Sequence, residues 1–200
     1  MNKQLLIATN NKGKVAELRA LLADLPIELV LPEQIGLDLH VEEDGRTYAE
    51  NAAKKAKAFA AAGGKIALAD DSGLEVAALD GAPGLYSARY HPKPEATDAD
   101  RRAYLLENLR GKPRPWTARF HASVAIAGLD GCLQLAEGDC PGEIIPEERG
   151  SGGFGYDPIF LLQDVGKTMA ELGAEEKNRL SHRARAIHNA RSILSEMLEL

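Results

Sequence analysis

The chain has 200 residues, enough for one domain with a substantial core or one domain with two lobes. It is 44% hydrophobic and 27% charged, and its formal net charge of −6 disfavours a polyanionic partner such as a nucleic acid polymer. The sequence contains no apolar run of about 18 residues, and its N-terminal apolar stretch is too short for a signal peptide. Two cysteines, Cys132 and Cys140, lack metal-site spacing and are too few for a disulfide framework. We therefore expect a cytoplasmic protein without a membrane partner.

The first half of the chain alternates between strand and helix patterns. Gln4–Thr9 reads as a strand, and Lys12–Asp24 follows as a helix with its leucines on one face. Thr47 and Glu50 form a capping-box pattern that opens an alanine-rich helix. The apolar run Ile66–Ala69 is short and lies between glycines, which is typical of a buried strand.

The second half adds a hairpin between two helices. Apolar residues alternate along Ala118–Ala127, and a turn at Leu129–Gly131 leads into a second strand. We expect helices at Thr97–Leu109 and Ser181–Leu198 and the second hairpin strand at Cys132–Ala136. Strands and helices that alternate early, followed by a hairpin, predict an α/β fold with a mixed β-sheet and flanking helices.

Two adjacent carboxylates, Asp70 and Asp71, end the apolar run and are followed by Ser72 and Gly73. Strand ends are where many α/β folds place their ligands. Neighbouring carboxylates repel each other, which is costly unless they share a cation or a proton. The alternative is that the two side chains point to opposite sides of the strand end and are solvated, and the motif alone leaves both interpretations open.

A polar loop, Thr9–Lys14, connects the first predicted strand to the first predicted helix. A helix N-terminus offers unpaired N–H groups and a positive dipole end, so it suits anions. Thr9 and Asn11 add hydrogen-bonding groups, and Lys12 and Lys14 add positive charge. The glycine spacing is not that of a Walker A loop, so either a phosphate site or a plain helix cap by Asn10 or Asn11 fits the pattern.

Three acidic residues, Glu42–Asp44, precede the helix that begins near Thr47. They fit a favourable interaction with the helix dipole. They also fit oxygen ligation of Mg²⁺, which commonly takes one or two carboxylates together with water and phosphate oxygens. One carboxylate from this segment and one from Asp70 or Asp71 would satisfy that pattern, and such oxygen sites also tolerate Mn²⁺.

Two further groups suggest recognition of a base. Four glycines surround Phe154 within Gly150–Asp157, and an aromatic ring on such a loop can stack on a base, although burial in the core is the commoner fate of a phenylalanine. Lys177 with His182 and Arg183 would supply several donors for carbonyl or phosphate acceptors, or simply a solvated helix start. Together the four groups indicate a nucleotide site.

The order of these motifs resembles the inosine triphosphate pyrophosphatase family over almost the whole chain. One departure is Asn10, where the family often has glycine. The motifs that carry the resemblance are Thr9-x-Asn11-x-x-Lys14, Glu42 and Glu43 ahead of Thr47 and Glu50-Asn51-Ala52, Asp70-Asp71-Ser72-Gly73-Leu74, Gly81-Ala82-Pro83-Gly84 with Ser87-Ala88-Arg89, Gly152–Pro158, and Ser181-His182-Arg183.

The resemblance implies an elongated, single two-lobed domain over residues 1–200, with a nucleotide cleft between the lobes, and a homodimer. It implies hydrolysis of ITP, dITP and XTP to the monophosphate and pyrophosphate, which would keep these nucleotides out of DNA and RNA. It further implies that Glu42 and Asp71 bind Mg²⁺ and that Asp71 accepts the proton of the attacking water. The implied substrate-binding residues are Thr9, Asn10, Asn11, Lys12, Gly13, Lys14, Ser72, Phe154, Gly155, Tyr156, Asp157, Lys177, His182 and Arg183.

Donors at His182 and Arg183 would match the 6-oxo group of hypoxanthine and xanthine and would mismatch the 6-amino group of adenine. No residue is identified that senses the C2 substituent, and the role of Asp70 stays open. Two alternatives are a pyrimidine-directed pyrophosphatase and a nucleotide-sensing or RNA-binding module. The Phe154 loop disfavours the first, and the acidic net charge with intact Glu42 and Asp71 disfavours the second.

Overall fold

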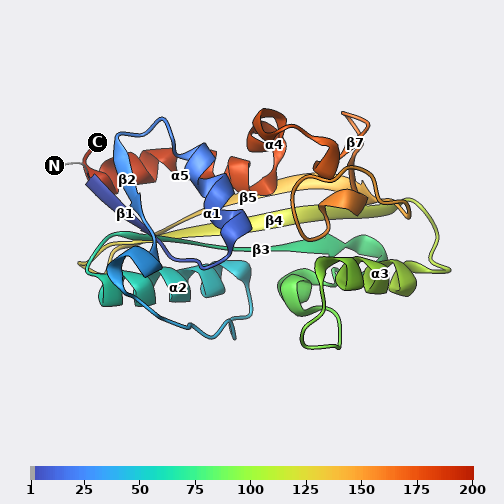
Figure 1. Ribbon diagram of the computed structural model, residues 1–200, viewed down its shortest axis with the longest axis horizontal. Helices are drawn as coiled ribbons and strands as arrows, with labels where there is room; N and C mark the ends of the chain where they lie inside the picture. Colours follow the sequence, from blue (N-terminus) through green and yellow to red (C-terminus); the bar gives the residue numbers. More distant parts are fainter. Residues whose placement is uncertain (1–2) are drawn as a thin grey trace. The chain divides into compact units, whose positions relative to one another are not determined.

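A computed structural model describes residues 3–200, so the first two residues of the N-terminal segment lie outside the description. Helices and short 3-10 turns flank a seven-stranded sheet of order β2-β1-β3-β4-β5-β6-β7 (Figure 1). The strands are β1 (Lys3–Ile7), β2 (Ile27–Val30), β3 (Ala67–Val76), β4 (Trp116–Ala127), β5 (Leu133–Ile144), β6 (Phe160–Leu162) and β7 (Lys167–Thr168). The α-helices are α1 (Lys12–Leu21), α2 (Tyr48–Gly63), α3 (Asp98–Leu109), α4 (Ala174–Leu180) and α5 (His182–Leu198).

The sheet is mixed, as the sequence predicts. Strand β1 pairs in parallel with β2 and β3, whereas β6 pairs antiparallel with β5 and β7. The turn predicted at Leu129–Gly131 closes the connection between β4 and β5, since the Gly128 N–H donates to the Cys132 carbonyl at 2.9 Å. No helix among the described residues is long and apolar enough to cross a membrane.

The chain divides into two compact units. The first comprises residues 1–71, 122–138 and 183–200, and the second comprises residues 72–121 and 139–182. The strands β3, β4 and β5 contribute residues to both units.

The first unit has helices on both faces of its strands. Along β1, Leu5 and Ile7 pack with α1 and α5, while Leu6 packs with α2 on the other side. Figure 1 shows the same order, with α1 and α5 on one side of these strands and α2 on the other. Strand residues alternate between faces, so neighbouring side chains in β1 and β3 meet different helices. Cores on both sides also explain why every residue of β4 from Ala122 to Ala127 is buried, including Ser123.

The second unit has one core of its own. Leu105 and Leu109 of α3 pack with Leu74 of β3, Phe160 of β6 and other buried residues of this unit. A thoroughly buried apolar side chain contributes about 1.5–3 kcal/mol, so Leu105 and Leu109 hold α3 firmly to its unit.

Several sequence expectations need correction. The second hairpin strand, predicted over Cys132–Ala136, runs from Leu133 to Ile144. The strand predicted to end at Ala69 continues to Val76, so Asp70 and Asp71 lie inside β3 and not at its end. Gly73 does not stop the strand, and the Leu74 N–H after it donates to the Ser87 hydroxyl at 2.8 Å. The helix predicted to reach Asp24 ends at Leu21. The short elements β2, β6, β7 and α4 were missed, since two to seven residues carry little periodic signal.

Candidate active site

Asp70 and Asp71 point to opposite faces of β3, and neither is solvated. Their exposed fractions are only 1% and 7%. Asp70 lies on the face that packs with α1 and α5, and Asp71 lies on the α2 face. Because successive side chains of a strand point to opposite faces, the two carboxylates are separated although they are adjacent in the sequence.

Asp71 is held by two side chains of α2. The Asn51 amide donates to Asp71 Oδ2 at 3.0 Å, and Lys55 Nζ lies 3.7 Å from Asp71 Oδ1. Burial raises the pKa of the Asp71 carboxyl above its ordinary value, although Lys55, Lys14 and the Asn51 hydrogen bond oppose part of that rise. A buried carboxylate with a raised pKa is a stronger base than an exposed aspartate.

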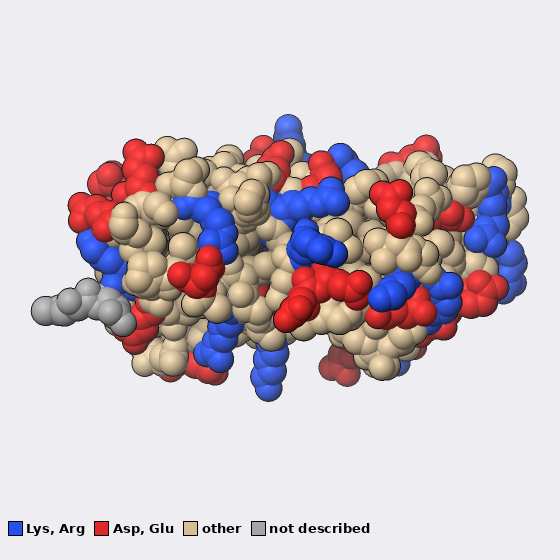
Figure 2. Space-filling model, turned by 90° about the horizontal axis from the view of Figure 1, so that it is seen from above, with Lys and Arg blue, Asp and Glu red and all other residues tan. Residues whose placement is uncertain are grey.

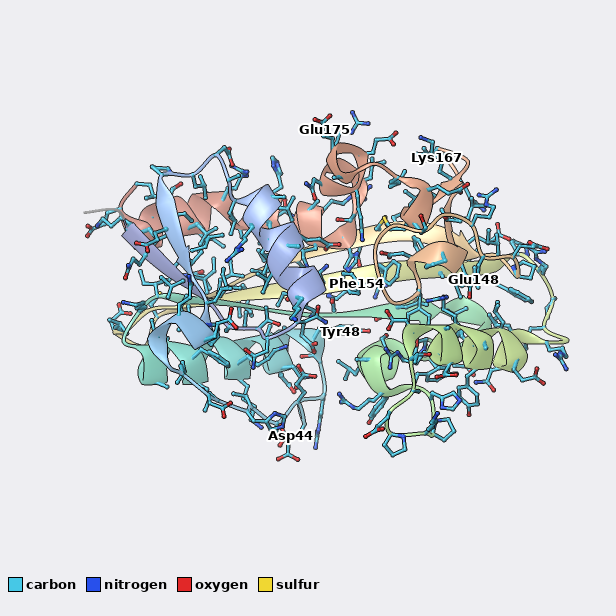
Figure 3. All side chains as sticks on the ribbon, in the orientation of Figure 1. Asp44, Tyr48, Glu148, Phe154, Lys167 and Glu175 are labelled. Atoms are coloured by element: carbon cyan, nitrogen blue, oxygen red, sulfur yellow. The ribbon has the colours of Figure 1, made fainter. Side chains whose placement is uncertain are left out.

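Asn51 also connects Asp71 to the acidic segment. Its side-chain oxygen accepts the Gly45 N–H at 2.8 Å, and a Cβ at Gly45 would lie only 2.6 Å from that same oxygen. The 1% exposed amide thus fixes the end of the segment that carries Glu42 and Glu43. Figure 3 labels Asp44 in this segment and Tyr48 at the start of α2.

The two candidate metal-binding glutamates differ in their surroundings. Glu43 shares Lys55 with Asp71, since Lys55 Nζ lies 2.8 Å from Glu43 Oε1, whereas Glu42 is exposed. Over residues 3–200, no group of three or more histidine, cysteine, aspartate or glutamate side chains is arranged to hold a metal. One or two carboxylates fit a cation such as Mg²⁺, whose other ligands are water and phosphate oxygens, and do not fit a closed zinc site.

The loop Thr9–Lys14 forms a capped helix start. Asn11 is the N-cap, and its side chain accepts the Lys14 N–H at 3.1 Å, while Thr9 Oγ1 accepts the Asn11 N–H at 3.2 Å. The capped helix start can still receive an anion, because Asn10, Asn11 and Lys12 are exposed and the first turn of α1 contains no acidic residue. The cap and the anion-binding interpretation are therefore compatible.

Lys14 reaches from this loop to β3. Its Nζ lies 3.3 Å from Asp70 Oδ2 and 3.4 Å from the Asp70 carbonyl, and Lys55 Nζ donates to the same carbonyl at 2.8 Å. Burial lowers the pKa of the Lys14 ammonium, and Asp70 only partly opposes this effect. Two lysines from different helices thus converge on the backbone of β3 beside the two aspartates.

Arg183 pairs with Asp70 in the interior. Its Nε and one terminal nitrogen lie 3.0 and 2.9 Å from Asp70 Oδ2, and another terminal nitrogen pairs with Glu17. Burial alone would raise the pKa of Asp70, but Arg183, Lys14 and Lys55 outweigh it and hold that pKa well below the ordinary value. Asp70 therefore stays ionised, which is the role that the sequence left open: it anchors two cations.

In the second unit, Phe154 lies on the glycine-rich loop (Figure 3). Its side chain is half-buried, so it is not fully buried in the core as one of the two sequence interpretations had it. Its N–H donates to Asp157 Oδ2 at 2.9 Å, and Lys177 Nζ lies 2.7 Å from the same oxygen. The lysine also lies 5.2 Å from the centre of the Phe154 ring. A Cβ at Gly153 would lie 2.0 Å from Asp157 Oδ2, so only glycine fits this tight turn, which has φ 72°.

The other residues predicted to bind the base have contacts outside the group formed by Phe154, Asp157 and Lys177. Tyr156 is buried, and its hydroxyl donates to the Ser87 carbonyl at 2.9 Å. The His182 ring stacks on Phe120 with ring centres 4.8 Å apart. Ser72 lies on β3 and Gly155 on the glycine loop, both in the second unit, whereas Arg183 belongs to the first unit. Within the units as described, the structure groups Phe154, Asp157 and Lys177 together, and it groups Arg183 with Asp70.

The sequence prediction did not include Asn51 and Lys55, which contact Asp71, among the candidate site residues. Both lie on the buried face of α2, four residues apart, among small apolar residues. The sequence did contain a signal for them: an amide and an ammonium four residues apart on an otherwise apolar helix face. Polar groups are buried on such a face only when they have hydrogen-bond or charge partners.

Comparison with known proteins decides the family. A sequence profile of the Ham1 family matches residues 5–193. The chain belongs to the Ham1 family. Two relatives named dITP/XTP pyrophosphatase are each 49% identical to it. The one from Desulforamulus reducens aligns over 97% of this chain and 96% of its own, and the one from Thermus thermophilus over 92% and 88%.

Solved structures of the Ham1 family agree in fold. A HAM1 protein from Coxiella burnetii is 40% identical, with a TM-score of 0.87 over 97% of this chain and 99% of its own. A structure from Mycobacterium abscessus, described as a nucleoside-triphosphatase / dITP/XTP pyrophosphatase, is 37% identical, with a TM-score of 0.74 over 92% and 97%. The family and the mixed α/β fold predicted from the sequence are thus confirmed.

Proposed function

We propose that this protein hydrolyses the non-canonical purine nucleoside triphosphates ITP, dITP and XTP to the monophosphate and pyrophosphate. The observation that carries the proposal is the buried Asp71 carboxylate, oriented by Asn51 and Lys55, in the same unit as the Thr9–Lys14 helix start. The activity in the names of the Ham1 relatives is the same one. Its consequence in a cell would be removal of these nucleotides before they enter DNA or RNA.

The reaction adds a water oxygen to phosphorus and breaks the α–β phosphoanhydride bond. Catalysis of phosphoryl transfer depends chiefly on positioning and on stabilising negative charge. The exposed N-terminus of α1, with Asn11 and Lys12, would bind the triphosphate, and Lys14 and Lys55 add positive charge next to β3. Asp71 would accept the proton of the attacking water.

Glu42 and Asp71 would hold a Mg²⁺ ion. When bound there, Mg²⁺ would neutralise negative charge on the triphosphate. The donor set supports this assignment, because a site with one or two carboxylates leaves ligand positions for phosphate and water. Glu43 is already paired with Lys55, which favours the exposed Glu42 as the second ligand.

The base would be bound in the second unit by Phe154 and Lys177, with Asp157 holding both. An aromatic ring suits stacking on a purine. The sequence predicted His182 and Arg183 as donors to the 6-oxo group, but Arg183 is paired with Asp70 and Glu17. We therefore propose the Lys177 ammonium as the donor to the 6-oxo group that adenine lacks. We further propose a homodimer in the cytoplasm. A partner such as DNA or RNA is disfavoured by the net charge of −6.

Product analysis with ITP, XTP, dITP and ATP tests the reaction. We expect pyrophosphate from the first three and slow turnover of ATP. Release of orthophosphate would refute the reaction, and equal rates on ITP and ATP would refute the specificity. Fastest turnover of dTTP or UTP would favour a pyrimidine-directed enzyme. Tight ITP binding without turnover would favour a sensor.

The same assay across Mg²⁺ concentrations tests the metal site. Glu42→Gln should raise the Mg²⁺ concentration needed for half the maximal rate more than Glu43→Gln does.

A further inference from the structure

One residue of the glycine-rich loop is held at both of its backbone polar groups by a single helix. Asp98 Oδ2 of α3 accepts the Gly155 N–H at 2.7 Å, and a terminal nitrogen of Arg102 donates to the Gly155 carbonyl at 2.9 Å. Positions 98 and 102 are four residues apart, so they share one face of α3. Both contacts lie within the second unit.

Arg102 also holds the other side of the loop. Its Nε lies 2.8 Å from Glu148 Oε1, and a terminal nitrogen lies 3.0 Å from Glu148 Oε2. Glu148 and Phe154, both labelled in Figure 3, belong to the connection between β5 and β6. A guanidinium bound to both carboxylate oxygens has a defined orientation, which fixes where its remaining donor points. Arg102 therefore joins the start of the loop to Gly155.

The loop has other anchors, since the Gly152 N–H donates to the Ala170 carbonyl at 3.0 Å, but several of its glycines adopt conformations that leave the backbone few side-chain restraints. Gly150, Gly153 and Gly155 all have positive φ values, of 81°, 72° and 62°. Nothing lies within 4 Å of the position of a Cβ at Gly155, so packing around this residue does not hold it in place. Charge-assisted hydrogen bonds from α3 supply that restraint.

The restraint acts directly on Phe154. The Gly155 N–H belongs to the peptide group that follows Phe154, and the N–H of Phe154 itself is held by Asp157. Both peptide groups that flank the ring are thus anchored, one by Asp157 and the other by Asp98. The helix that provides Asp98 and Arg102 is itself fixed by Leu105 and Leu109 in the core of its unit.

We propose that Asp98 and Arg102 are positioning residues that set purine selectivity by holding the Phe154 loop in place. The inference rests on the proposed function, in which this loop receives the base. Discrimination between a 6-oxo and a 6-amino group requires a base held in one orientation, since a base that shifts can avoid an unpaired polar group. Asp71, Lys14 and Lys55 lie on other elements, so the chemical step is expected to depend less on α3.

Steady-state kinetics of Arg102→Leu and Asp98→Ala with ITP and ATP provides the test. We expect KM for ITP to rise about tenfold, the scale of one lost charge-assisted hydrogen bond, while kcat changes by less than about threefold. The ratio of kcat/KM for ITP over ATP should fall by about tenfold. Arg102→Lys, which keeps one donor, should recover part of the ratio.

Glu107→Ala is the matched control, because Glu107 pairs with Arg110 on the exposed side of the same helix and does not touch the loop. A merely structural role of α3 would lower the thermal unfolding temperature without changing the ITP to ATP ratio. An unchanged ratio in both Arg102→Leu and Asp98→Ala would overturn the proposal, as would an equal fall in Glu107→Ala.

Hydrogen exchange of residues 150–157 separates this inference from the proposed function. Faster exchange in Arg102→Leu than in Glu107→Ala, measured without nucleotide, supports the restraint, and equal exchange overturns it. If the wild-type protein releases no pyrophosphate from ITP, the proposed function fails, whereas the exchange result still reports on the loop.

Discussion

Asp70 and Asp71 show how alternation along a strand gives two identical side chains different chemistry. Asp70 faces two cations and is held ionised, while burial beside α2 raises the pKa of Asp71. The difference comes from what each face of β3 meets: Arg183 and Lys14 on one side, Asn51 and Lys55 on the other. The proposed base and the anchor of two cations therefore occupy successive positions.

Asp71→Asn should remove most turnover of ITP, because the amide cannot accept the proton of water at neutral pH. Loss of a general base typically lowers kcat by about 10²–10⁴-fold. Binding of ITP, measured by calorimetry, should persist. Asp44→Asn is the control, since Asp44 is an exposed neighbour of the site that pairs with Lys54. Near-normal turnover of Asp71→Asn would reject this residue as the base.

At the level of elements, Asp70 ties three segments together. Its carboxylate in β3 meets Lys14 of α1 and Arg183 of α5, and Arg183 also pairs with Glu17 of α1. Because Arg183 is 1% exposed, the desolvation of its charge is offset mainly through these carboxylates. The same contacts hold Lys14 beside β3, the strand that carries Asp71.

Asp70→Ala should destabilise the protein by about 3 kcal/mol or more, the usual cost of leaving a buried charge without its main partner. Urea unfolding followed by circular dichroism measures the loss. Asp24→Ala breaks a surface pair between the chain after α1 and Arg191 of α5, and we expect little change because solvent screens that pair. Equal stability of Asp70→Ala and Asp24→Ala would contradict the anchoring role.

At the scale of the whole molecule, the formal net charge is −6. Figure 2 shows lysine and arginine interspersed with aspartate and glutamate on the face drawn. A surface of this kind offers little attraction to a nucleic acid backbone. It agrees with a small nucleotide as substrate, bound by a few local cations.

The homodimer is a prediction at the same scale. Sedimentation equilibrium should give a mass near twice the 21.5 kDa of one chain. We consider Tyr86, Arg89 and the strand Ala118–Ala127 as contributors to the dimer surface. Tyr86 is 61% exposed, whereas Phe120–Ala127 are buried within a single chain, so Tyr86→Ser should weaken association. A mass of one chain at micromolar concentration would contradict the dimer.

Much of the architecture was readable from local patterns. The capped helices at Thr47 and Thr97, the alternating strand at Ala118–Ala127 and its hairpin are local features, determined by residues a few positions apart. Family membership was also readable, because several motifs in a fixed order are far more specific than any one of them. The site residues inferred from that resemblance, Glu42, Asp71 and Phe154 among them, stay predictions.

The contacts that give those residues their properties were decided by tertiary structure. No periodicity reveals that Asp70 pairs with Arg183, 113 positions away, or that Asn51 joins Gly45 to Asp71. The sequence by itself determined which chemical groups are present and which elements carry them. Only the packing of α1, α2 and α5 on β3 decided which groups are buried together, and burial with a particular partner is what sets a pKa.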